Sequence, residues 1–168
     1  NSFQAGIYAA ASRISLLFAL LVSSLGGVIA PRFSSFKKKT EITSYLKKVT
    51  LMVSGICLLM LMTVLLADPI IRSVFGVKYL LAIPVFQAIT IAMIPFLFSV
   101  VTTQPLIYSF NQPKFFAATT VIQVVSLVAL DYFLIAIYGA FGPAIAMGLT
   151  NVLVLVLTGG RLIYLLRK

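Results

Sequence analysis

Five long apolar runs limit what this chain can fold into. They cover residues 8–30, 49–67, 80–108, 115–137 and 142–160. The hydrocarbon core of a bilayer is about 30 Å thick and needs roughly 20 apolar residues in a helix. A chain in lipid must satisfy its own backbone hydrogen bonds, and a helix does so within one segment. The sequence therefore predicts an all-α polytopic membrane protein with about five transmembrane helices, forming a single transmembrane domain over residues 1–168.

Composition favours the same class of protein. Hydrophobic residues make up 61% of the chain and charged residues 10%. A soluble domain is usually about half apolar and about a quarter charged. A soluble fold of this length would leave a large apolar surface in water, so we expect membrane lipids to cover it.

The lysines and arginines fall unequally on the two ends of the predicted bundle. Three lie at one end: Arg13, Arg72 and Lys78. The other end receives Arg32, Lys37, Lys38, Lys39, Lys47, Lys48, Lys114, Arg161, Arg167 and Lys168. Cytoplasmic loops carry the excess of such residues, so we expect the loop with the three consecutive lysines and the C-terminus to be cytoplasmic. The net charge of +10 then reflects topology, and no basic face with interleaved aromatic residues predicts nucleic-acid binding.

An odd number of spans places the first residue, Asn1, on the outer side. The chain does not begin with Met, and no signal-peptide pattern opens it. We therefore expect a fragment of a longer protein whose missing part lies on the N-terminal side.

The connection ADPIIRSVFGVKY between the second and third runs has the pattern of a short amphipathic helix. Asp68 is a plausible N-cap, Pro69 suits the first helical position, and Gly76 suits the C-terminal end. We expect this helix to lie at the membrane interface.

Two charged residues lie inside the predicted spans. Arg13 follows the outer end of the first run, and Asp131 precedes the outer end of the fourth. Intramembrane charges usually face a bundle interior or a wet cavity. Arg13 and Asp131 could line an outward-opening cavity, where they would bind an anionic substrate or form an ion pair that acts as a gate. Alternatively, they are an interfacial pair, or Asp131 reaches headgroups or Lys78.

Two amides lie deepest in the apolar runs. Gln123 and Asn151 could each hydrogen-bond a sugar or phosphate, and we predict them as substrate-binding residues together with Arg13. The alternative is a bond to a neighbouring helix, which in membranes averages below about 1 kcal/mol. Small residues also recur at four-residue spacing, which predicts close helix packing, along two ridges: Ala19, Ser23 and Gly27, and Ala140, Ala144 and Gly148.

Groups for catalysis are scarce. Histidine is absent and the single cysteine, Cys57, lies inside an apolar run. The three acids, Glu41, Asp68 and Asp131, do not cluster, and no glycine-rich phosphate loop with its lysine occurs. The sequence predicts no enzyme activity, no catalytic residue, no cofactor and no metal site.

Four segments, in order, resemble polysaccharide flippases of the multidrug/oligosaccharidyl-lipid/polysaccharide exporter superfamily. They are AGIYAAASRISLLFALLVSSLGGVIAPRFSSF, ADPIIRSVFGVKYLLAIPVFQ, FNQPKFFA and LIAIYGAFGPAIAMGLTNV. The resemblance covers essentially the whole chain. Pro143 stands where the family usually has a small residue, Ala136 where its hairpin proline lies, and Asp131 where asparagine is common.

The resemblance implies the partial C-terminal lobe of an exporter fold with twelve or more helices. It implies an O-antigen-type flippase that moves a lipid-linked oligosaccharide across the inner membrane for surface polysaccharide (lipopolysaccharide) biosynthesis, by alternating access. The expected partners are that substrate, membrane lipids and the missing N-terminal lobe. A cation-coupled multidrug exporter of the same fold and a non-transport membrane scaffold subunit remain alternatives.

Overall fold

The computed structural model describes residues 2–36 and 38–168. Asn1, which was predicted on the outer side, and Lys37, which was counted among the cytoplasmic cations, lie outside the described residues. The described chain contains α1 (Ser2–Ser35), α2 (Lys39–Leu65), α3 (Ala67–Phe75), η1 (Val77–Tyr79), α4 (Ala82–Tyr108), α5 (Pro113–Tyr138), η2 (Gly139–Phe141) and α6 (Gly142–Arg167). It contains no strand in these residues. The prediction of an all-α polytopic membrane protein is confirmed.

Four apolar helical segments are long enough to cross a membrane: Ala5–Ser35, Lys39–Leu65, Ala82–Tyr108 and Pro113–Arg167. The last consists of two helices, α5 and α6, which reverse direction at η2 and pack against each other. Counted separately, they give the five long helices of the sequence prediction. At about 1.5 Å per residue, each is longer than the roughly 30 Å hydrocarbon core.

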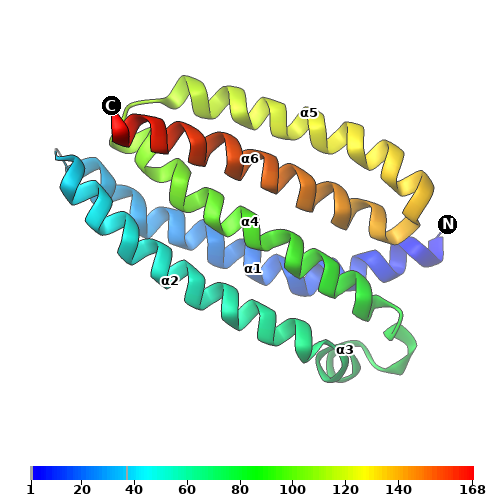
Figure 1. Cartoon of the computed structure of the whole chain (residues 1–168). Helices are drawn as coiled ribbons and strands as arrows, with labels where there is room; N and C mark the ends of the chain where they lie inside the picture. The colour runs from blue at the N-terminus through cyan, green and yellow to red at the C-terminus, as the bar shows by residue number, and fades with distance from the viewer. Residues whose placement is uncertain (1, 37) are drawn as a thin grey trace.

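The long helices lie side by side with alternating direction, and α4 occupies the middle of the bundle (Figure 1). It packs against α6, α1 and α2, and α5 contacts the bundle chiefly through α6. Side-chain hydrogen bonds join α4 to each of these three helices. Gln87 Nε2 donates to the Val64 carbonyl of α2 (3.0 Å), and Ser109 Oγ, at the C-cap of α4, donates to the Phe33 carbonyl of α1 (2.7 Å). The Thr102 hydroxyl lies 2.7 Å from the Thr158 hydroxyl of α6.

Large apolar side chains remain exposed along the outer helices. Tyr132 and Ile137 on α5 are 78% and 71% exposed, and Leu51 on α2 is 76% exposed. Only Thr119 is buried among the residues of α5. Such a surface is stable against lipid chains and would aggregate in water.

The ends of α1 and α2 differ from the sequence prediction. The first span was expected to end before Pro31, yet α1 continues through it to Ser35. Pro31 cannot donate a hydrogen bond to the Gly27 carbonyl four residues earlier, and its ring crowds that carbonyl, yet the helix continues for one more turn. The second span was expected to reach Ala67, but α2 ends at Leu65 and Ala67 begins α3.

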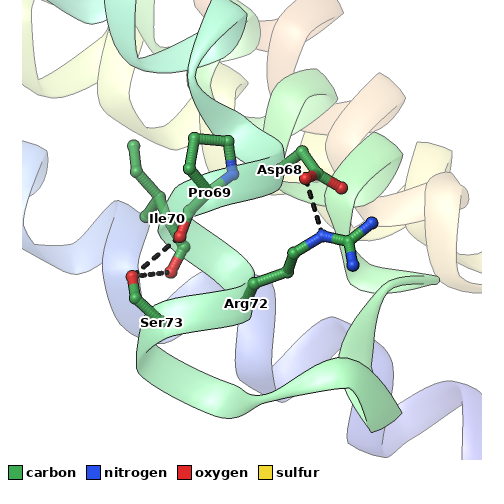
Figure 2. A network of polar contacts seen from close by, with 5 residues as sticks. All are labelled: Asp68, Pro69, Ile70, Arg72 and Ser73. Atoms are coloured by element: carbon green, nitrogen blue, oxygen red, sulfur yellow. Dashed lines mark hydrogen bonds and ion pairs between the residues drawn. The ribbon is translucent and has the colours of Figure 1, made fainter.

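The predicted N-cap role of Asp68 is wrong, as is the placement of Pro69 at the first helical position. Leu66 is the N-cap of α3, and the two residues lie second and third in the helix. Asp68 instead accepts a 2.7 Å hydrogen bond from Arg72 Nε one turn later (Figure 2). This bond raises the pKa of Arg72 above its ordinary value, so the guanidinium stays charged. Gly76 ends the helix as expected, with φ 80°.

The α5–α6 turn depends on glycine. Gly139 caps α5 with φ 56°, a conformation that favours glycine. Gly142 begins α6, and a Cβ there would lie 2.6 Å from the Ile135 nitrogen and the Leu134 carbonyl carbon. The two helices therefore meet with backbone against backbone at this end.

The two small-residue ridges have different roles. Ala144 is buried on α6, and a Cβ on Gly148 would lie 3.3 Å from the Ala92 Cβ, so this ridge packs closely on α4 as predicted. The α1 ridge does not: Ser23 and Gly27 are exposed. Nothing in the described chain lies within 4 Å of an added Cβ at Gly27.

Candidate functional site

Arg13 lies on the N-terminal part of α1 with its side chain exposed. It lines a cavity of about 210 Å³ together with Gly6, Ala9, Phe75 and Tyr79, the two aromatic residues coming from the α3–η1 segment. Within the described residues no carboxylate oxygen lies within 4 Å of the Arg13 guanidinium. The ion pair in this part of the chain joins Arg72 to Asp68 and does not involve Arg13. A cation with small residues on one side and two aromatic rings on the other could receive an anionic group.

Asp131 lies on α5, seven residues before the helix ends. Its side chain is partly buried, and its Oδ1 atom is covered without a hydrogen-bond partner in the described chain. Its carboxylate is within electrostatic range of Tyr8 on α1. Arg13 and Asp131 therefore belong to the same end of the bundle but are not paired in this conformation. Their role as a gate remains a prediction.

Gln123 and Asn151 contact each other. Gln123 Nε2 donates to Asn151 Oδ1 at 3.2 Å, and Asn151 Nδ2 donates to the Ala92 carbonyl at 2.9 Å. Asn151 is 4% exposed. These two bonds join α5, α6 and α4 in one polar layer, which is the alternative that the sequence left open for both amides. A substrate-binding role remains a prediction.

We expect Asn151→Leu to destabilise the bundle by about 1–2 kcal/mol, because it removes two interhelical hydrogen bonds. Gln123→Leu should cost about 0.6 kcal/mol, because the bond to Ala92 survives. Unfolding in mixed micelles, followed by the reactivity of the buried Cys57 thiol, measures both. In the double variant, Gln123→Leu should lower the stability little beyond the loss from Asn151→Leu, because that change already removes the bond between the two side chains. A fully stable Asn151→Leu variant that no longer exports substrate would contradict the structural role and favour the substrate contact.

A groove of about 400 Å³ runs between α1 and α4 and was not predicted. The small residues of the α1 ridge form one wall, and Phe96, Gln104 and Tyr108 of α4 line the other. Gln104 Nε2 lies 3.1 Å from the position of a Cβ on Gly26, and its Oε1 is covered without a partner in the described chain. The ridge was read as a packing surface because spacing alone does not distinguish a packed face from an open one.

Arg161 forms a second unpredicted cluster at the opposite end from Arg13. Its Nη2 donates to Gln112 Oε1 at 2.9 Å, and its guanidinium carbon lies 5.6 Å and 5.7 Å from the Phe115 and Tyr164 ring centroids. Such cation–π contacts contribute about 0.5–2 kcal/mol. The cluster fixes the α4–α5 turn against α6. Arg161 at the end of the last apolar run, with Tyr164 three residues later, was the available signal in the sequence.

The described residues hold several polar and charged groups within the apolar bundle. No group of three or more His, Cys, Asp or Glu side chains gathers among them. These polar and charged groups are the Arg13 guanidinium beside a small cavity, the partly buried Asp131 carboxylate, and the hydrogen-bonded amides of Gln123 and Asn151. This arrangement suits recognition of a polar or anionic ligand within an apolar bundle.

Fold and composition together define a multi-pass helical membrane protein. The chain is 26% identical over 153 residues to a Shigella flexneri protein named "Putative O-antigen transporter". The match covers 89% of this chain and 36% of that protein, so the chain spans about a third of the relative's length. This supports a distant, family-level relationship to O-antigen transporters. No family model matches the chain, and no solved structure matches it significantly.

Proposed function

We propose that the chain is the C-terminal part of a transporter that moves a lipid-linked oligosaccharide across the cytoplasmic membrane for surface polysaccharide synthesis. The observation that carries the proposal is the alignment of 89% of the chain with a protein named as an O-antigen transporter. The bundle of long apolar helices supports a transport role. The protein would act without chemical catalysis, and its partner would be an N-terminal lobe of the same chain.

In this proposal the two lobes alternate access to a central polar cavity. Arg13 would attract the phosphate groups that link oligosaccharide to lipid, because its guanidinium is exposed and has no acidic partner nearby in the described chain. Gln123 and Asn151 would contact sugar hydroxyls if opening of the bundle released their mutual bond. The C-terminus would lie in the cytoplasm with the loop that holds Lys38 and Lys39.

Deletion of the gene tests this function. We expect surface polysaccharide to be lost and the lipid-linked precursor to accumulate in a form that an externally added glycosidase cannot reach. Expression of the intact gene should restore both, whereas Arg13→Glu should not. A deletion strain with normal surface polysaccharide and precursor exposed on the outer side would refute the proposal.

One observation favours a second candidate, a cation-coupled multidrug exporter. Asp131 is a partly buried carboxylate whose Oδ1 has no partner in the described chain, and such a group could bind a proton or a sodium ion. If this function holds, deletion should raise sensitivity to cationic drugs and leave polysaccharide unchanged. Asp131→Asn should reproduce the drug sensitivity.

A further inference from the structure

A cleft of about 420 Å³ lies where α1 ends and α2 begins. Arg32 and Lys48 line it with the aromatic side chains of Phe36 and Tyr45. Both cations are exposed. The α1–α2 junction lies at the opposite end of the bundle from the start of α1 and from the α5–α6 turn (Figure 1). Arg13 is in the N-terminal part of α1 and Asp131 is near the end of α5, so the cleft is separate from the site described above.

The sequence places the two cations at headgroup depth. Arg32 lies two residues after the end of the first apolar run, and Lys48 directly precedes the run that starts at Val49. Cationic side chains at such positions meet the phosphate layer of the adjacent leaflet. Leu51, one turn further along α2, is 76% exposed, so a lipid chain could lie along α2 directly below the cleft.

A cluster of three packed aromatic side chains, Phe33, Phe36 and Tyr45, forms the base of the cleft. The Phe33 ring centroid lies 6.2 Å from that of Phe36 and 5.0 Å from that of Tyr45, and the latter two are 5.3 Å apart. Phe33 is fully buried, and its carbonyl accepts the 2.7 Å bond from Ser109 of α4. Three helices therefore hold the cleft in shape before a ligand arrives.

Two hydroxyl groups in the cleft are free of hydrogen bonds within the part of the chain that the structure describes. Thr40 and Ser44 line it, and within the described chain neither hydroxyl makes a hydrogen bond. Thr43 and Thr50 on the same helix instead bond back to carbonyls at 2.9 Å and 2.8 Å. Two cations and two free hydroxyls beside one another match the charge and acceptor oxygens of a phosphate.

Glu41 also lines the cleft and opposes an anion. Its Oε2 accepts the Lys38 backbone N–H at 3.4 Å. No cation of the described chain lies within 4 Å of it, so Arg32 and Lys48 remain uncompensated. The acid reduces the positive field of the cleft without cancelling it.

We propose that this cleft binds the headgroup phosphate of an anionic phospholipid in the adjacent leaflet. The two cations face the phosphate, the free hydroxyls donate to its oxygens, and the acyl chains follow the exposed apolar face of α2. The site requires only that the bundle lies in a membrane, so it does not depend on the proposed transport function.

Native mass spectrometry of the full-length protein tests this site, with phosphatidylglycerol and phosphatidylcholine of equal chain length as probes. We expect phosphatidylglycerol to be retained at least tenfold better. Arg32→Gln or Lys48→Gln should each weaken its binding about fivefold, and the double variant about 30-fold. Lys114→Gln removes the same charge at the same end of the bundle but outside the cleft, and should change binding less than twofold.

Glu41→Gln should strengthen phosphatidylglycerol binding, which provides a gain-of-binding test if the cation variants fold poorly. Equal retention of the two lipids by the unmodified protein would overturn the site. So would a loss in Lys114→Gln as large as that in Arg32→Gln, because binding would then reflect general surface charge. If millimolar inorganic phosphate displaced phosphatidylglycerol, the cleft would be a site for free phosphate. If a polyprenyl diphosphate bound in preference to phosphatidylglycerol, the cleft would be a substrate site. Either result would reject the phospholipid site.

Discussion

Gly142→Ala is expected to lower the stability of the bundle by about 3 kcal/mol, the upper end of the usual cost of overpacking. An added Cβ would lie 2.6 Å from two backbone atoms of α5, at Leu134 and Ile135. Backbone cannot move aside as the end of a flexible side chain can. The α5–α6 hairpin must therefore open, and the packing of α6 on α4 weakens with it.

The measurement is thermal unfolding in detergent, followed by the reaction of a maleimide dye with the buried Cys57 thiol. Gly160→Ala is the matched control, because an added Cβ there has no neighbour within 4 Å. That change should be neutral or stabilising by up to about 1 kcal/mol, since alanine favours a helix more than glycine does. If the two variants unfold at the same temperature, the close approach at Gly142 is wrong.

Arg13→Glu is expected to reduce polysaccharide export more than tenfold at normal protein level. Placing a carboxylate where the substrate phosphate should bind replaces attraction with repulsion, and like charges brought together cost several kcal/mol. A tenfold loss requires only about 1.4 kcal/mol. The assay is surface polysaccharide in a deletion strain that expresses each variant, with immunoblots to confirm equal amounts of membrane protein.

Two further variants separate this role from a general charge effect. Arg13→Lys keeps the positive charge and should retain most of the export. Lys78→Glu reverses a charge at the same end of the bundle, on a residue that does not line the Arg13 cavity, and should export normally. Full export by Arg13→Glu would exclude Arg13 from substrate binding.

The sequence predicted the helical class and the order of the long helices because both follow from the length of apolar runs. Helix ends were harder to predict, since they depend on local contacts. Pro31 remains inside α1 because a proline near a helix end removes one backbone hydrogen bond and can bend a helix without ending it. Asp68 is not the N-cap because α3 starts two residues earlier than expected, at Ala67. Asp68 then lies inside the helix, where its carboxylate bonds Arg72 one turn later.

The candidate site was less predictable than the fold. The pattern identified Gln123 and Asn151 as the deepest amides of the apolar runs. Their contact with each other depends on how α5 and α6 are rotated about their axes, which the pattern does not give. The same spacing of small residues produced a packed seam at Gly148 and an open groove at Gly27. The spacing of small residues predicts which face of a helix they share. It does not predict whether another helix packs on that face, because this depends on the tertiary arrangement.

The dependence of α5 on α6 has a consequence for how the protein is made. During synthesis α5 leaves the ribosome before α6 exists, and its main neighbour in the finished bundle is α6. Until α6 is made, the Gln123 side chain lacks its hydrogen-bond acceptor in the finished bundle, which is the Asn151 Oδ1 atom. Biogenesis should therefore insert these two helices as one unit, and a nascent chain stopped after α5 should be a substrate for membrane quality-control proteases.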